Sequence, residues 1–182
     1  LACIDCVAAV LDKPAAATTE DLISSFAAEM KGSGKVSSDY RVRSVSRLDA
    51  PTSGALMVPL SQEAEAALKA LFSSREVSKS YLALVIGDAP PDGIVDLKLR
   101  SVQSVDRYRA VVHPYGKPAV TAYRRLAQLK GDAYQSRYSL LLAWPLTGRM
   151  HQIRAHMAHI GLPLAGDMRY GPRKNSTEWG GN

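Results

Sequence analysis

Short apolar runs alternate along the chain with segments that repeat at helical spacing. The runs over residues 4–11, 55–60 and 81–86 have the length of buried strands, and the first and last end at Asp12 and Gly87, residues typical of turns. Similar patterns predict three more strands, over residues 94–99, 119–126 and 138–144, with Gly131 and Asp132 in the turn between the last two.

Three segments predict helices. Thr19 is the expected N-cap of a helix over residues 20–30, and Ser61 is that of a helix that ends near Phe72. A third helix is predicted over residues 151–160 and is ended by Gly161. The segment 101–115 between the strands is expected to be basic and irregular.

The helical spacing also predicts which side chains share a face. In the second helix the expected core face consists of Ala64, Ala67, Leu68 and Leu71. In the third helix one face is expected to carry His151, Arg154 and Ala158, and the other Ile153, His156, Met157 and Ile160. Arg154 could then line a cleft while the apolar residues pack in the core.

Charge is distributed unevenly along the chain. The 23 Lys and Arg residues and the 17 Asp and Glu residues give a net charge of +6. Residues 98–182 hold 14 of the basic and 4 of the acidic residues, an excess of +10. This surface could face the phosphates of a nucleic acid or could only aid solubility, and charge alone leaves both interpretations open. No apolar run approaches the roughly 20 residues of a membrane-spanning helix, so no membrane partner is expected.

The cysteines and histidines do not predict a metal site. Cys3 and Cys6 form a C-x-x-C pair, but a four-ligand zinc site needs further ligands and no second such pair is present. His151 and His156 are five residues apart, a poor spacing for sharing a metal ion. We expect packing or nucleic-acid-contacting histidines and two free thiols. Free thiols indicate a reducing intracellular compartment, either the cytoplasm or an organelle such as the mitochondrion.

The stretch Arg41–Leu60 carries the strongest candidate for chemistry. Asp49 lies before a turn bracketed by Pro51 and Gly54, against the predicted strand that follows. A carboxylate buried there would need a cationic partner. The alternative is an Asx-type turn in which Asp49 only caps Thr52 or Ser53.

Three separated segments resemble the signature segments of the RluA-type RNA pseudouridine synthases. The segment SRLDAPTSG, residues 46–54, resembles the family pattern His-Arg-Leu-Asp-x-x-Thr-Ser-Gly, with Ser46 in place of His. Residues 75–87 resemble the Lys-x-Tyr-x-Ala-x-Val strand, through Lys79, Tyr81, Ala83 and Val85. Residues 146–171 resemble the Gly-Arg-x-His-Gln-Ile-Arg-x-His helix and the Gly-Asp-x-x-Tyr-Gly loop. The family's later Leu-His-Ala segment and final hairpin have no match here.

The resemblance implies roles for the matching residues. Asp49 would act at the ribose as nucleophile or base, Tyr81 would lie against the base, and Arg154 would pair with Asp49. Arg47 would help to displace the base from the RNA stack, and Ser46 would alter an RNA contact without abolishing the chemistry. The residues expected to bind RNA, or to orient its phosphates, are Arg47, Ser46, Lys79, Lys117, Arg149 and His151.

Together with the predicted elements, the resemblance implies an α+β fold with a mixed, largely antiparallel central sheet, packed helices and a basic active-site cleft. Residues 1–182 would form one catalytic domain, which can be incomplete at both ends, because the chain begins at Leu1 and has no match for the family's final segments. The implied activity is isomerisation of uridine to pseudouridine in RNA without a cofactor. Ribosomal RNA is the expected partner, with ribosomal or assembly-factor proteins. The alternative is an inactive relative that binds RNA as a ribosome-assembly factor. For the cluster of Arg107, Tyr108 and Arg109, stacking on unpaired bases and an edge-strand surface are both open.

Overall fold

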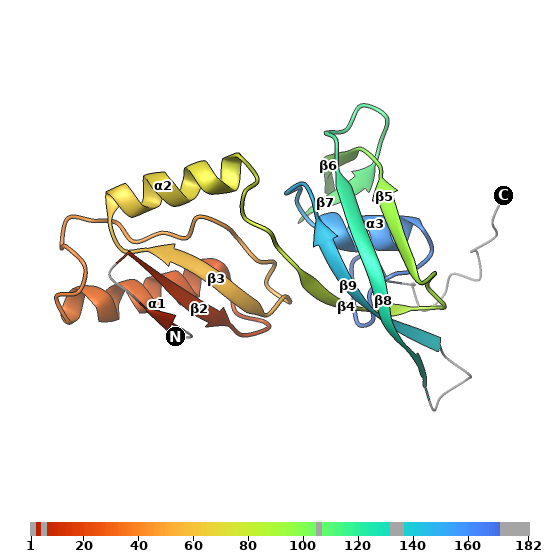
Figure 1. The fold of residues 1–182 in the computed structure, drawn as a ribbon, viewed down its shortest axis with the longest axis horizontal. Helices are drawn as coiled ribbons and strands as arrows, with labels where there is room; N and C mark the ends of the chain where they lie inside the picture. The colour runs from red at the N-terminus through yellow and green to blue at the C-terminus, as the bar shows by residue number, and fades with distance from the viewer. Residues whose placement is uncertain (1–2, 5–6, 105–106, 132–136, 172–182) are drawn as a thin grey trace. The chain divides into compact units, whose positions relative to one another are not determined.

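The computed structural model describes residues 3–4, 7–104, 107–131 and 137–171, which divide between two compact units, Leu1–Val77 and Ser78–Asn182 (Figure 1). The α+β class expected from the sequence is confirmed. All pairs of described strands are antiparallel, in agreement with the largely antiparallel character that was expected, and they form three sheets.

The first unit is a three-stranded sheet with two helices. Strands β1 (Cys3–Ile4), β2 (Ala8–Lys13) and β3 (Gly54–Pro59) lie in the order β1-β2-β3. Phe26 and Met30 of helix α1 (Thr19–Gly32) pack with Leu11 and Leu56 of the sheet in the core. Helix α2 (Gln62–Ser73) follows β3.

The start of α1 differs from the prediction by one residue. Thr18 is the N-cap, since its hydroxyl accepts a hydrogen bond from the Asp21 backbone N–H at 3.1 Å. Thr19, the predicted cap, is the first helical residue and is buried. The N-cap prediction for Ser61 is confirmed by its hydrogen bond from the Ala64 N–H at 3.2 Å.

The core face predicted for α2 is only partly correct. Ala64 is buried and Leu68 half-buried, whereas Ala67 and Leu71 are exposed. Glu65 is buried instead and accepts a hydrogen bond from the Tyr40 hydroxyl at 3.1 Å. Burial and this bond raise the pKa of Tyr40 to about 12. The buried side of α2 therefore includes a hydrogen-bonded glutamate, which hydrophobic periodicity did not predict.

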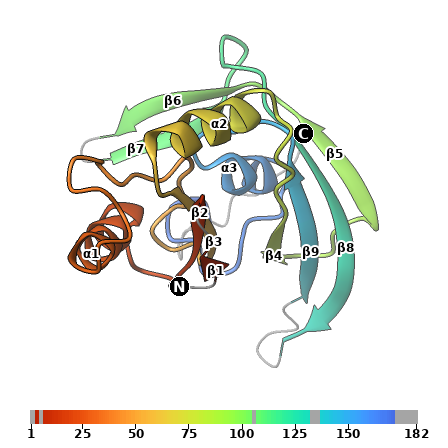
Figure 2. The same cartoon turned by 60° about the vertical axis from the view of Figure 1, so that its left-hand side comes forward.

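The second unit contains two sheets and helix α3 (Gln152–His159) (Figure 2). Strands β4 (Tyr81–Ile86), β9 (Arg137–Pro145), β8 (Val120–Lys130) and β5 (Asp92–Asp96) form the larger sheet in that order. Strands β6 (Leu99–Ser104) and β7 (Arg107–Val112) form the smaller one. The strand predicted over 94–99 is thus divided between β5 and β6. The expectation of an irregular segment 101–115 was wrong, because most of it forms the β6–β7 pair.

Helix α3 is buried around most of its circumference. It packs against the larger sheet through Met157 and against β7 through Ala155 and Ala158. The two-faced prediction was therefore partly wrong, since Ala158 is buried and Ile160 is 39% exposed. The helix ends as predicted at Gly161, whose φ of +79° favours glycine. None of the described helices combines the length and the apolar character required to span a bilayer.

Candidate active site

Asp49 lies in a loop of the first unit whose neighbouring residues are both anchored. On one side, the Thr19 hydroxyl donates to the Leu48 carbonyl at 3.2 Å, and Leu48 packs against the core. On the other side, the Ala50 carbonyl accepts from the Ala16 N–H at 2.9 Å. The Thr52 N–H donates to the Asp49 carbonyl at 2.9 Å and closes the predicted turn. The half-buried Asp49 is thus held in place from both sides.

Lys13 also holds the loop of Asp49 in place. Its ammonium is fully buried and donates to the carbonyls of Pro14, Ala17 and Ala50 at 3.0, 2.6 and 3.1 Å. Three carbonyl acceptors match the three donors of an ammonium, which offsets much of the cost of burying the charge. Lys13 therefore ties the turn after β2 to the turn that follows Asp49.

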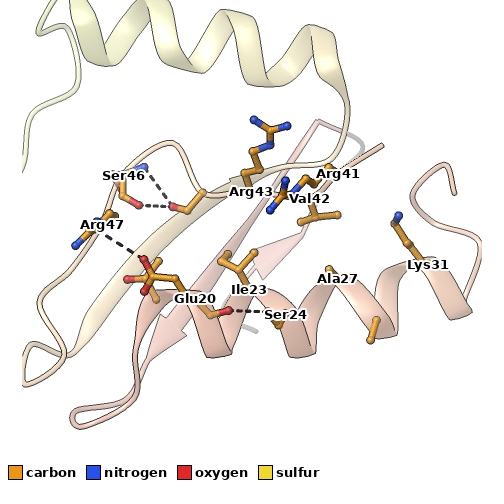
Figure 3. Close-up of a pocket in the computed structure, with 13 residues that line it drawn as sticks. Glu20, Ile23, Ser24, Ala27, Lys31, Arg41, Val42, Arg43, Ser46 and Arg47 are labelled. Atoms are coloured by element: carbon orange, nitrogen blue, oxygen red, sulfur yellow. Dashed lines mark hydrogen bonds and ion pairs between the residues drawn. The ribbon is translucent and has the colours of Figure 1, made fainter. Parts of the chain in front are cut away.

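Ser46 and Arg47, two of the predicted RNA-binding residues, line a groove in the first unit (Figure 3). Ser44 fixes the backbone there, since its hydroxyl lies 2.6 Å from the Ser46 carbonyl and 3.1 Å from that of Met57 in β3. The Arg47 guanidinium is 4.0 Å from the Glu20 carboxylate, and both side chains are exposed. Arg47 is thus presented to solvent two residues before Asp49.

In the second unit, Arg154 makes a two-pronged ion pair with Asp167. Its Nε and Nη2 atoms donate to the two carboxylate oxygens at 2.7 and 2.9 Å, and the side chains are 13% and 4% exposed. The N–H groups of Arg169 and Tyr170 also donate to Asp167, at 2.9 and 3.1 Å. Burial opposes charge on Asp167, but these bonds outweigh it and hold its pKa below the ordinary value.

Tyr170 links this ion pair to His151. The Tyr170 hydroxyl accepts from the Ala110 N–H at 2.7 Å and is hydrogen-bonded to His151 Nδ1 at 2.9 Å. The guanidinium groups of Arg154 and Arg109 lie 5.1 and 5.3 Å from the centre of its ring. These distances are within the range of cation–π attraction. His151 has the left-handed φ of 51°, uncommon for a residue other than glycine.

The loop that precedes α3 holds Arg149, and two other predicted phosphate-orienting residues, Lys117 and Lys79, belong to segments that approach it. Arg149 Nε donates to the Pro118 carbonyl at 3.0 Å, next to the exposed Lys117. The Lys79 ammonium lies beside Gly148, where its Nζ atom would be 3.8 Å from a Cβ if the glycine carried one. The buried Gln152 side chain fixes this loop, since it accepts from Thr147 and Arg149 and donates to Val120 and Thr121. The second unit therefore brings Lys79, Lys117 and Arg149 to one loop.

The predicted site residues divide between the two units. Asp49, Ser46 and Arg47 belong to the first, and the second holds Tyr81, Lys79, Lys117, Arg149, His151 and Arg154. Tyr81 is half-buried and begins β4, where it pairs with Ala143. The pairing of Asp49 with Arg154 stays a prediction.

The sequence reasoning missed Asp167 and Lys13. Asp167 is part of the Gly-Asp-x-x-Tyr-Gly segment, so its place in a matching motif was an available signal. Lys13 had a weaker signal, as a lysine at the end of an apolar strand. Both residues position a neighbouring segment through polar contacts, and hydrophobic periodicity does not predict such contacts.

The structure assigns His156 to packing. It is fully buried, with Nδ1 2.9 Å from the Thr121 hydroxyl and Nε2 2.9 Å from the Leu97 carbonyl. Burial lowers its pKa, despite the opposing bond to Leu97. Within the described residues no group of three His, Cys, Asp or Glu side chains could hold a metal ion. Cys6 lies outside those residues, so the prediction about the C-x-x-C pair stays open.

Comparison with known proteins identifies the family. A family profile described as RNA pseudouridylate synthase matches residues 8–159. The chain is 40% identical over 143 residues to the tRNA pseudouridine synthase C of Pectobacterium carotovorum, an alignment that covers 74% of this chain and 38% of that protein. It is 41% identical over 129 residues to the ribosomal large subunit pseudouridine synthase D of Escherichia coli, covering 71% of this chain and 37% of that protein.

The fold agrees with these matches. The solved structure of human RNA Pseudouridylate Synthase Domain Containing 1 superposes with a TM-score of 0.76 and 26% identity, over 91% of this chain and 66% of that one. The present chain spans well under half the length of the two bacterial relatives. Asp49, Tyr81 and Arg154 all lie within the matched region, and the chain belongs to the RNA pseudouridylate synthase family, in agreement with its resemblance to the RluA-type enzymes.

Proposed function

We propose that this chain isomerises uridine to pseudouridine in structured RNA and that ribosomal RNA is its substrate. The observation that supports this most is the loop of Asp49. The resemblance gives Asp49 a role at the ribose. Its two neighbours in the chain, Leu48 and Ala50, are both held by hydrogen bonds. Catalysis requires such preorganisation of the reacting group.

The reaction rearranges the bonds of one nucleotide. The bond between ribose C1′ and uracil N1 breaks, the base turns, and a bond between C1′ and C5 forms. The C5 hydrogen leaves and N1 gains one, so substrate and product have the same atoms and no oxidant or cofactor is required. Asp49 acts at the ribose as nucleophile or base, and Tyr81 lies against the base and assists proton removal from C5. Glycosidases use two carboxylates because they activate water, whereas this isomerisation can use one.

In this proposal Arg154 orients Asp49, as the resemblance implies. The bonds to Asp167 engage two N–H groups of the Arg154 guanidinium, which carries five. The carboxylate of Asp167 therefore fixes the orientation of the Arg154 guanidinium.

RNA binding is assigned to Arg47, Ser46, Lys79, Lys117, Arg149 and His151. Turning a nucleotide out of its stack costs a few kcal/mol, and Arg47, exposed beside Asp49, would fill the vacated space. In the second unit, the loop that Gln152 fixes would orient phosphates through Arg149 and its lysine neighbours.

The experiment is incubation of the purified chain with unmodified transcripts of ribosomal RNA and transfer RNA, followed by chemical mapping of pseudouridine. Conversion of defined uridines in ribosomal RNA is expected, and ribosomal or assembly-factor proteins would then be partners. Conversion of transfer RNA alone would refute the substrate assignment. Binding of both RNAs without conversion would refute the activity and favour an RNA-binding assembly factor.

A further inference from the structure

The groove in the first unit extends well beyond Ser46 and Arg47. It has a volume of about 620 Å³ and runs between α1 and the extended segment 41–47 (Figure 3). Ile23 and Ala27 of α1 are half-buried at its base, where they pack against the core of the unit. All of its lining residues belong to the first unit.

The charge of this groove is almost entirely positive. Lys31, Arg41, Arg43 and Arg47 line it, and Glu20 is the one acidic residue among the lining side chains. Arg41 and Arg43 are exposed, whereas Val42 between them is buried in the core. Alternate residues of an extended segment point to opposite sides, so burial of Val42 turns both arginines toward solvent on the same side.

We propose that this groove binds the sugar-phosphate backbone of the substrate RNA beside the target uridine. This inference rests on the proposed function, because segment 41–47 leads directly into Asp49. Arg47, at one end of that segment, is exposed two residues before Asp49 and lines the groove. Arg41 and Arg43 lie further along it and would hold the adjoining phosphates.

The side chains of the groove favour the RNA backbone over the bases. Arginine matches the geometry of phosphate oxygens. No aromatic side chain is among the lining residues, so the groove lacks the stacking platform of proteins that read unpaired bases. Its contacts would therefore be independent of sequence and would fix the register of the strand.

The length of the groove fits several nucleotides. The face of α1 from Glu20 to Lys31 extends about 16 Å at 1.5 Å per residue. A stacked strand advances about 3.4 Å per phosphate, so about five phosphates span this face. An acidic peptide could meet the same charges, but the continuity of the segment with Asp49 favours the substrate of the reaction.

The test compares two double variants of the full chain with equal loss of charge. Arg41→Gln with Arg43→Gln removes the two groove arginines. The control, Arg75→Gln with Arg124→Gln, removes two exposed arginines outside the groove. Binding of a labelled single-stranded oligouridylate is measured over a salt series. Two lost phosphate contacts should lower the slope of log affinity against log salt by about 1.4 and weaken binding about tenfold at physiological salt.

A smaller effect in the groove variant than in the control would overturn the inference. A third variant, Arg41→Lys with Arg43→Lys, keeps the two charges and should retain most of the wild-type RNA affinity. If this variant binds RNA as weakly as the Gln variant and its thermal midpoint also falls, the arginines act on folding and the inference fails. Competition by oligoglutamate as strong as by oligouridylate of equal charge would assign the groove to an acidic protein instead.

Pseudouridine formation by the wild-type chain separates this inference from the proposed function. If the wild type converts uridine but groove and control variants have the same KM, the groove inference fails alone. If the wild type converts no uridine while oligouridylate binding still depends on Arg41 and Arg43, the proposed catalytic function fails and the groove remains an RNA site.

Discussion

Substitution of Asp167 by Asn should destabilise the second unit strongly. The Asp167 side chain is 4% exposed and that of Arg154 13% exposed, so the change removes the negative charge that accepts two hydrogen bonds from a largely buried guanidinium. Breaking a buried pair in this way costs about 3 kcal/mol or more. For a chain of this length, that corresponds to a fall in the thermal midpoint of about 6–12 °C. The measurement is differential scanning calorimetry at pH 7.

A matched control is available on the surface. Asp88 pairs with Arg137 at 2.6 Å, but their side chains are 43% and 63% exposed. The same change there, Asp88→Asn, should cost less than about 1 kcal/mol, because water screens the exposed pair. An equal fall in the thermal midpoint of the two variants would refute the reasoning that burial makes the Arg154–Asp167 pair important.

Acid should act on the same pair. The pKa of Asp167 is below its ordinary value of 3.8 in the folded state, so the stabilisation is present above about pH 4 and is lost as the pH falls through the folded pKa. On acidification the wild type should lose the stabilisation that ionised Asp167 provides, whereas Asp167→Asn has no such stabilisation to lose. A steeper acid loss in the variant than in the wild type would contradict the assigned direction of the pKa shift.

Three further outcomes are expected. Because burial lowers the pKa of His156, the free energy of unfolding should fall as the pH drops below about 6.5. His156→Gln should make the free energy of unfolding less dependent on pH between pH 7 and 5, and an unchanged pH dependence would contradict this. Lys13→Met removes the donor shared by the Pro14, Ala17 and Ala50 carbonyls, and of these Ala50 still accepts from the Ala16 N–H, so the change should cost about 2 kcal/mol and reduce turnover, as checked by urea unfolding and pseudouridine mapping. Arg154→Lys should lose most activity because lysine lacks the planar fork, and activity near that of the wild type would exclude a bidentate role.

Most regular elements could be predicted from the sequence because their signals are local. The strand over residues 81–86 and the Ser61 cap follow from an apolar run and from capping chemistry. The β6–β7 pair was missed because its polar residues do not produce the alternation of a half-buried strand. The burial of Glu65 was missed because its hydrogen-bond partner, Tyr40, lies 25 positions earlier in the sequence.

The candidate site was accessible from the sequence through motifs more than through physical patterns. The resemblance identified Asp49, Tyr81 and Arg154, all within the matched family region. It placed Asp167 in a matching motif but did not show that this residue contacts Arg154, and it did not identify the contact of Lys13 with the loop of Asp49. Such contacts join segments that only the folded backbone brings together, so composition and periodicity carry no trace of them.

The central claim is that Asp49 performs the chemistry, and one substitution tests it most directly. Asp49→Asn keeps the size of the side chain and removes its charge, while the bonds to Leu48 and Ala50 that hold the loop remain. Pseudouridine formation in ribosomal RNA transcripts and RNA affinity are measured together on the purified variant. We predict no detectable pseudouridine, with affinity within a few fold of the wild type. Measurable pseudouridine formation by the purified Asp49→Asn variant would contradict the account.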